Sequence, residues 1–133
     1  IPIGKAKLIS EGTSFSIITY GLGVHWALAY QKEHPEFSFD ILDLRSLQPW
    51  DKEAVFKSVK KTGRALILHE DTLCSGFGAE ISASINENCF TFLDAPVLRC
   101  ASLDTAIPMN KALEKQFLAN NRLHEFVNKL ISY

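Results

Sequence analysis

The side chains best able to do chemistry in this sequence are His69 and its two neighbours, Glu70 and Asp71. They end the nearly continuous apolar run Arg64–His69, which predicts a strand buried on both faces of a sheet. In open α/β sheets, ligands and partners bind at the carboxyl ends of such strands. A histidine beside two carboxylates could transfer protons there. The alternative is that the imidazole packs at an interface while the carboxylates accept hydrogen bonds from nearby backbone groups.

A second candidate is the turn Tyr20–Trp26, which follows a predicted strand and opens a helix. With Gly21, Gly23 and an acidic residue about twenty positions later (Asp43), it has the outline of a dinucleotide-binding fingerprint. Trp26, however, occupies the position of the third glycine, where a large indole prevents the close helix–strand packing that the motif requires. We therefore expect a tight strand-to-helix turn, whose free helix N–H groups could still hold an anion. A nucleotide-binding module remains an alternative of another functional class.

Cys74 lies just before the segment Ser75–Gly78, which is expected to start another helix. A thiol at a helix N-terminus can be reactive, but the sequence pairs no base with Cys74. The glycines of the segment allow the loop to approach a neighbouring element or a partner closely. The three cysteines cannot all form disulfides, and neither they nor the four histidines have the spacing of a metal site, so we expect reduced thiols.

These residues are positioned by an alternation of predicted strands and helices, which indicates βαβ units and a three-layer α/β fold. We expect a mostly parallel sheet with helices on both faces. The opening strand–turn–strand could add an antiparallel edge strand, with Gly12 supplying a positive φ in the turn. The expected strands are Lys5–Ser10, Phe15–Tyr20, Ser38–Asp43, Arg64–His69 and Val97–Ala101, and the expected helices are Val24–Glu33, 51–62, a helix from Ser75, and Asn121–Ile131.

Two of the expected helices have well-defined inner faces. Asp51 is a suitable N-cap for the first, and Thr62–Gly63 ends it. Apolar spacing at three and four residues predicts which side chains face the sheet. These are Ala54, Val55, Ser58 and Val59 in the first helix, and Leu123, Phe126, Val127, Leu130 and Ile131 in the last.

Composition and charge narrow the functional class. With 47% hydrophobic and 22% charged residues and a net charge of −1, the chain has the composition of an ordinary globular domain. No basic patch suits a nucleic acid, and no apolar run approaches the length of a membrane span. We expect one intracellular domain over residues 1–133. Because the sequence does not start with Met and opens in what reads as a connecting segment, we expect it to be part of a longer polypeptide.

Several consecutive segments resemble the transketolase-type C-terminal domain of 2-oxo acid dehydrogenase β-subunits. Ile41–Asp51 is similar to that family's DLR-x-L-x-P-W-D stretch. His69–Glu70 followed by Ser75–Glu80 is similar to its HE…GGFGAE loop, with Ser75 replacing a glycine. His69–Glu70 and Glu87–Phe90 favour the branched-chain (2-oxoisovalerate) group over the pyruvate group. The match continues in order through Ile1–Ala6, Glu11–Thr13, Ser58–Arg64, Asn86–Phe90, Leu93–Pro96, Arg99 and Asp104–Pro108, after which the sequence departs from the family pattern.

The resemblance implies a parent 2-oxoisovalerate dehydrogenase (2-methylpropanoyl-transferring) that decarboxylates a 2-oxo acid and reductively acylates lipoyl groups. It implies that thiamine diphosphate and Mg²⁺ are bound by domains outside this chain. No catalytic, cofactor-binding or metal-binding residue is therefore assigned here, and the isolated domain is expected to be inactive. Because partners of doubly wound sheets bind at the carboxyl edge of the strands, we also predict an interface with a neighbouring domain or subunit, formed by His69, Glu70, Ser75, Gly76, Phe77 and Gly78.

The resemblance also implies a homo-oligomer that docks to the dihydrolipoyl acyltransferase core through Asp94 and Tyr133. The expected location is the cytoplasm, or the mitochondrial matrix in a eukaryote. A pyruvate dehydrogenase β-subunit is one alternative. The C-terminal domain of a transketolase or deoxyxylulose-phosphate synthase is another, in which the same edge would help to bind a sugar phosphate. A cluster of arginines near His69 would favour that reading, and only Arg45 and Arg99 are candidates for it.

Overall fold

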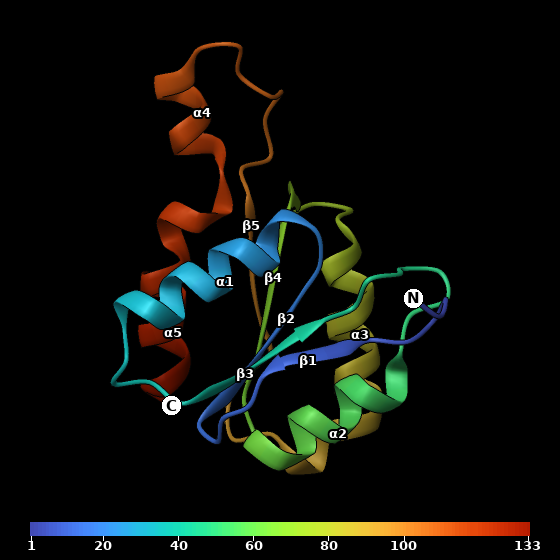
Figure 1. The fold of residues 1–133 in the computed structure, drawn as a ribbon. Helices are drawn as coiled ribbons and strands as arrows, with labels where there is room; N and C mark the ends of the chain where they lie inside the picture. Colours follow the sequence, from blue (N-terminus) through green and yellow to red (C-terminus); the bar gives the residue numbers. More distant parts are fainter.

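The structure, a computed structural model, describes residues 1–133 as a five-stranded sheet with helices on both faces (Figure 1). β3, β2, β4 and β5 run parallel to one another. The predicted three-layer, mostly parallel α/β fold is therefore confirmed. The strands are β1 (Lys7–Ser10), β2 (Phe15–Thr19), β3 (Phe39–Asp43), β4 (Ala65–Thr72) and β5 (Leu98–Ser102), in the spatial order β1-β3-β2-β4-β5.

β1 is the antiparallel edge strand, but its partner is not the one that the opening strand–turn–strand suggested. It pairs with β3 rather than forming a hairpin with β2. Gly12, in the turn between β1 and β2, has no positive φ, contrary to our expectation. Its role is close approach, because a Cβ at Gly12 would collide with the backbone of Phe39. The turn therefore passes tightly over the start of β3, which leaves β1 on the outer side of that strand.

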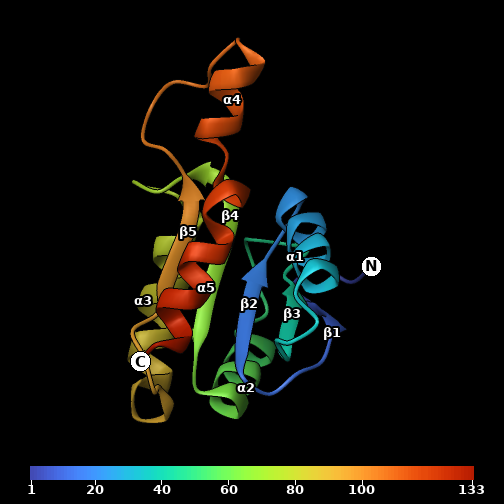
Figure 2. The same ribbon diagram turned by 90° about the vertical axis from the view of Figure 1, so that its left-hand side faces the viewer.

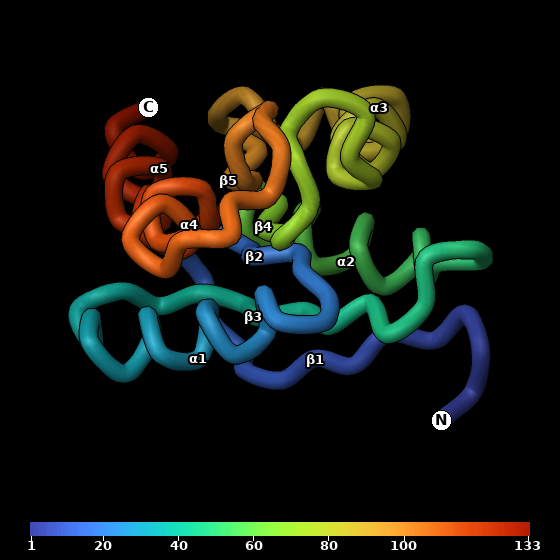
Figure 3. The backbone as a smooth tube through the Cα atoms, turned by 90° about the horizontal axis from the view of Figure 1, so that it is seen from above, coloured from blue at the N-terminus to red at the C-terminus, as the bar shows by residue number.

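The helices form the two outer layers. Figure 2 shows α1 (Leu22–Glu33) and α5 (Leu123–Ile131) in front of the sheet and α2 (Lys52–Thr62) and α3 (Phe77–Cys89) behind it, and the view from above agrees (Figure 3). Each face has its own apolar core. As predicted, Asp51 caps the start of α2, and its side chain accepts a hydrogen bond from the Ala54 N–H. Gly63, with a φ of 75°, caps the end. None of the helices combines the length and the apolar character needed to cross a membrane.

The segment after β5 departs most from the sequence prediction. It contains a helix that was not expected, α4 (Lys111–Phe117), and a 3-10 turn, η2 (Ala119–Arg122). The last helix therefore begins at Leu123 rather than at Asn121. A further 3-10 turn, η1 (Phe90–Phe92), extends α3.

In α5, the predicted inner face is largely confirmed. Leu123, Val127 and Leu130 are buried and Phe126 is half-buried. Ile131, however, is 37% exposed, so its predicted inner position is wrong. Eight helical residues turn Ile131 about 80° away from Leu123, which places it at the rim of the apolar stripe.

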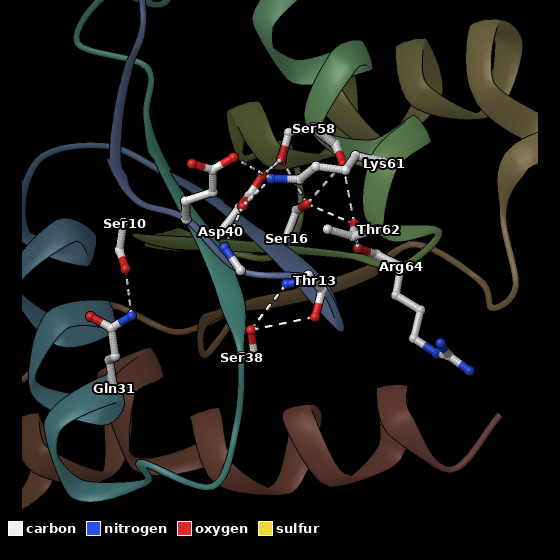
Figure 4. A network of polar contacts seen from close by, with 12 residues as sticks. Ser10, Thr13, Ser16, Gln31, Ser38, Asp40, Ser58, Lys61, Thr62 and Arg64 are labelled. Carbon is white, nitrogen blue, oxygen red and sulfur yellow. Dashed lines mark hydrogen bonds and ion pairs between the residues drawn. The ribbon is translucent and has the colours of Figure 1, made fainter.

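A buried polar network ties β2, β3 and α2 together at the amino ends of the parallel strands (Figure 4). Asp40 is 1% exposed. Its Oδ2 accepts a hydrogen bond of 2.6 Å from Ser58, and its Oδ1 accepts bonds from the Gly12 N–H (2.8 Å) and the Lys61 ammonium (2.7 Å). Ser16 of β2 joins the network through Ser58, at 2.7 Å between the two hydroxyl oxygens. These bonds satisfy the buried carboxylate.

Candidate functional site

The candidate site lies at the carboxyl ends of β2 and β4, which are neighbours in the sheet. After β2 the chain continues into α1 on one face, and after β4 it continues into α3 on the other. This divergence leaves an opening between the strand ends, where doubly wound sheets bind ligands and partners. Tyr20 follows the last residue of β2, and His69, Glu70 and Asp71 lie in the last part of β4. The sequence thus placed these β4 residues at the correct edge.

The imidazole of His69 is fully buried beneath the loop that leads into α3. Its Nδ1 lies 3.1 Å from the backbone oxygen of Asp71, so Nδ1–H donates this hydrogen bond, while Nε2 has no partner. Two glycines make room for the ring. A Cβ on Gly78 would stand 2.5 Å from Nε2 and 2.7 Å from Cδ2, and one on Gly76 would collide with the backbone oxygen of Thr72 and stand 2.7 Å from Cε1. The loop backbone therefore lies directly against the imidazole, which explains both glycines.

Burial determines the protonation of His69 and of the neighbouring Tyr20. Loss of solvation lowers the pKa of His69; the hydrogen bond and charge of Asp71 oppose this shift, and Arg99 adds a smaller lowering. The Tyr20 ring, 6.0 Å from His69 between centroids, has its pKa raised to about 12 by burial and by the charge of Asp71. Both rings are therefore uncharged at neutral pH. Nε2 is buried without a hydrogen-bond partner, so the imidazole packs directly beneath the loop.

The predicted interface residues divide into an outer and an inner set. Ser75 is noteworthy because it has a φ of 60°, a left-handed conformation that is uncommon outside glycine. Glycine adopts this conformation at the least steric cost. Glu70 and Ser75 are exposed and Phe77 is half-buried, whereas His69, Gly76 and Gly78 are buried and act from beneath the loop.

The loop is held by residues that sequence reasoning did not assign to it. Asp104 accepts a 2.7 Å hydrogen bond from the backbone N–H of Cys74, and the guanidinium of Arg99 donates a 3.0 Å bond to the backbone oxygen of Leu73. Asp104 lies 30 residues from Cys74 in the chain, so no local pattern signals the contact. The Cys74 thiol itself is free and exposed, and its nearest hydrogen-bonding group is the Ser75 hydroxyl at 3.9 Å.

The glycine turn after β2 serves packing. Gly21 has a φ of 57° and open space where a Cβ would lie, whereas a Cβ on Gly23 would collide with the hydroxyl of Thr19. Trp26 is half-buried against the core of its face of the sheet. Asp43 accepts a 3.0 Å hydrogen bond from a backbone N–H two residues further on, within a local turn. The tight strand-to-helix turn therefore accounts for the residues that resemble a dinucleotide fingerprint.

A cavity of about 380 Å³ opens at this edge, between the strand ends and α4. Its charged lining residues are Glu70, Asp71 and Glu114, with no basic residue among them. Such a lining repels phosphate groups. No group of three or more His, Cys, Asp or Glu side chains is arranged to hold a metal ion. The residues of this edge therefore do not fit thiamine diphosphate with its Mg²⁺.

The two predicted docking residues lie away from this edge. The side chain of Asp94 is 63% exposed, with its Oδ2 3.9 Å from a guanidinium nitrogen of Arg64, and its backbone N–H donates to the Gly63 oxygen at 2.8 Å. Tyr133 is 58% exposed. Figures 1 and 2 place the C-terminus toward the amino ends of the parallel strands, where α3 also ends. Asp94 is part of the lining of a groove of about 920 Å³ beside α3.

Comparison with known proteins gives consistent matches. The model of the family "Transketolase, C-terminal domain" matches residues 4–122. The 2-oxoisovalerate dehydrogenase subunit beta of Dictyostelium discoideum (mitochondrial) is 44% identical over 112 residues, which are 82% of this chain and 30% of that protein. The corresponding subunit of Bacillus subtilis is 42% identical over 90% of this chain and 38% of that protein. The pyruvate dehydrogenase E1 component subunit beta of Mycoplasma genitalium is 38% identical over 98% of this chain and 41% of that protein.

Among solved structures, a split gene transketolase, described as an inactive beta4 tetramer, superposes with a TM-score of 0.83 at 22% identity. The match covers 99% of this chain and 43% of that one, and at this identity it shows the fold alone. The chain thus spans less than half the length of the proteins that it matches.

Proposed function

Because this chain belongs to the transketolase C-terminal domain family, we propose that it is the assembly and docking domain of the decarboxylating component of a branched-chain 2-oxo acid dehydrogenase complex. The observation that carries this proposal is the 44% identity to a 2-oxoisovalerate dehydrogenase β-subunit over 82% of the chain. The proposed parent enzyme removes carbon dioxide from a branched 2-oxo acid and passes the acyl group to a lipoyl group. It would work in the cytoplasm of a bacterium or in the mitochondrial matrix of a eukaryote.

The proposed role of this domain is structural. Thiamine diphosphate and Mg²⁺ supply the decarboxylation chemistry when they are bound, and we assign their binding to other domains of the parent enzyme. Two observations support this division of labour. His69 lies sealed under a loop with its Nδ1–H engaged, and the lining of the nearby cavity is acidic rather than suited to a diphosphate.

We assign the loop after β4 to the contact with a neighbouring domain or subunit. Its outer surface is formed by Glu70, Ser75 and Phe77, while the buried His69 and its two glycines hold the backbone in shape. A rigid, outward-facing loop at the carboxyl edge of a doubly wound sheet suits such a contact. The relatives from Dictyostelium discoideum and Bacillus subtilis are named as β-subunits of a dehydrogenase. This supports the presence of other subunits in the parent assembly.

We assign Asp94 and Tyr133 to docking on the dihydrolipoyl acyltransferase core. An exposed aromatic side chain supplies contact area, and the Asp94 carboxylate with the chain-terminal carboxylate can pair with Arg or Lys of a basic partner. Affinity of the parent enzyme for the core should fall in Asp94→Asn and on deletion of the last two residues. The loss should shrink at high salt, because charge pairs are screened. Glu33→Gln, an exposed carboxylate change on α1, is the matched control. Unchanged affinity in both test variants would place docking elsewhere.

The proposed substrate class is tested on the purified full-length enzyme with its lipoyl-bearing partner. Decarboxylation of 2-oxoisovalerate should exceed that of pyruvate in kcat/KM, and acylation of the lipoyl group should accompany it. The 38% identity to a pyruvate dehydrogenase β-subunit across nearly the whole chain favours pyruvate as the second candidate. A preference for pyruvate in this assay would select that candidate, and no activity on either acid would reject both.

A further inference from the structure

The chain between β5 and α5 forms an anchored arm with an uncovered apolar tip. We define the arm as residues 103–117, which stand beyond the carboxyl ends of β4 and β5 (Figures 1 and 2). Its base is fixed by Phe117, which is 5% exposed and whose backbone oxygen accepts bonds from the Leu103 N–H (3.1 Å) and from the Arg122 guanidinium (3.2 Å). Near the tip, the Asn110 side chain caps α4. Hydrogen bonds therefore hold the arm at its base, and the Asn110 cap holds the start of α4.

The tip of the arm, residues 107–113, exposes three large apolar side chains. Ile107 is 74% exposed, Leu113 is 53% exposed and Met109 is fully exposed. Leu103 at the base and Leu73 on the adjoining loop are also exposed. Scattered single apolar side chains are normal on a protein surface, but three large ones within the seven residues 107–113 indicate a surface that another molecule covers.

The cavity beside the arm adds a charge preference. Its apolar lining residues are Tyr20, Ile107, Phe117 and Leu118, and its charged lining residues are Glu70, Asp71 and Glu114. None of these carboxylates takes part in an ion pair within the chain, where the acidic partners in ion pairs are Glu11, Glu36, Asp40 and Asp94. Unpaired carboxylates beside apolar lining residues match the two halves of an Arg or Lys side chain, whose aliphatic stem packs on apolar atoms while its charged end meets acceptors.

We propose that the arm and this cavity form a docking surface for a segment of another subunit of the enzyme, one that carries an Arg or Lys side chain flanked by apolar residues. The stem of that side chain lies on Ile107 and Leu118, and its charge faces Glu70 and Glu114. The flanking apolar residues cover Met109 and Leu113. This inference rests on the proposed function for the existence of the other subunit and extends it by naming the chemistry of the contact.

The first test identifies the occupant directly. In the full-length enzyme, Met109 is replaced by the photo-crosslinking residue p-benzoylphenylalanine. Position 109 suits this replacement because the Met109 side chain is fully exposed. Irradiation of the assembled enzyme, digestion and mass spectrometry should identify one peptide of another polypeptide that contains Arg or Lys. Cross-links confined to the same polypeptide, cross-links to a segment without a basic residue, or no cross-link at all would each overturn the proposal.

The second test measures the charge contribution. Glu70→Gln with Glu114→Gln should weaken subunit association roughly fivefold at low salt and have little effect at high salt, because exposed charge pairs are modest and screened. Glu33→Gln with Glu53→Gln, exposed positions on α1 and α2, removes the same number of charges and should leave association unchanged. Equal losses in the two double variants, or no loss in the first, would contradict the assigned contact.

The same enzyme preparation separates this inference from the proposed function. An enzyme that decarboxylates 2-oxoisovalerate but gives no cross-link to a basic segment refutes the docking surface and leaves the proposed function intact. An enzyme that gives the expected cross-link but acts on no 2-oxo acid refutes the proposed function and leaves the docking surface intact.

Discussion

Gly78 tests whether the loop after β4 is shaped by the His69 ring beneath it. In Gly78→Ala, the new methyl group would stand 2.5 Å from Nε2 and 2.7 Å from Cδ2 of the imidazole. Real Cβ atoms do not come that close to other heavy atoms, so either the ring or the loop must shift. The ring is fully buried, so it is enclosed by neighbouring groups that must shift if it moves.

The expected cost follows from two opposing effects. Overpacking of a filled interior costs about 1–3 kcal/mol. Replacement of a helical glycine by alanine regains up to about 1 kcal/mol, because alanine loses less backbone entropy. Gly78 lies in the first turn of α3 and its φ is not positive, so no backbone strain is added. We expect Gly78→Ala to lower the free energy of unfolding by about 1–2 kcal/mol. Ala79→Gly at the next, exposed position measures the glycine–alanine difference separately.

The assay is a double-mutant cycle by chemical denaturation. His69→Ala removes the ring, so Gly78→Ala in that background should cost nothing or should stabilise the protein, since the remaining close contact is the Ile67 side chain at 3.1 Å. The coupling free energy between the two sites should be about 1–3 kcal/mol. If Gly78→Ala costs the same with and without the imidazole, the ring does not explain the glycine and this account of the loop is wrong.

Three further predictions concern stability. Leu130→Ala, at a fully buried position of α5, should lower the unfolding free energy by about 2–5 kcal/mol. Ile131→Ala, at the next and 37% exposed position, should cost well under half as much. Similar denaturation midpoints for the two variants would contradict the packing of α5. Asp40→Asn should cost about 2–4 kcal/mol, because the buried carboxylate accepts bonds from Gly12, Ser58 and Lys61, while Glu11→Gln at an exposed carboxylate 3.6 Å from Lys61 should change the midpoint little. Burial lowers the pKa of His69 in the folded chain, so below the ordinary value of 6.5 the unfolded chain binds a proton that the folded chain does not. Stability should therefore fall with pH from 6.5 down to the folded pKa, with a slope of at most about 1.4 kcal/mol per pH unit, and the slope should shrink in His69→Asn; equal slopes in both proteins would show that His69 is not the group responsible.

Much of the fold could be predicted from the sequence because its signals are local. Strand–helix alternation and apolar periodicity depend on neighbours a few residues apart, and they gave the parallel sheet with helices on both faces. Asp51 and Gly63 bound α2 as their cap chemistry predicts. His69 was placed at the carboxyl edge because a continuous apolar run leads directly to it. The bulk of Trp26 was sufficient to disfavour a dinucleotide site.

The tertiary structure decided the features that depend on distant segments. β1 pairs with β3 because Gly12 lets the turn pass over the backbone of Phe39, a contact invisible in either segment alone. The sequence does not show whether a histidine faces solvent or lies under a loop. The His69 ring is buried because the start of α3 packs over the end of β4. The acidic cavity is likewise lined by both Glu70 and Glu114, which are 44 residues apart in the sequence. Glu114 reaches this cavity because it lies in the arm, whose helix α4 was not expected. Local sterics and periodicity therefore fix which elements form, while long-range packing fixes which polar groups become buried and which apolar surfaces stay open to a partner.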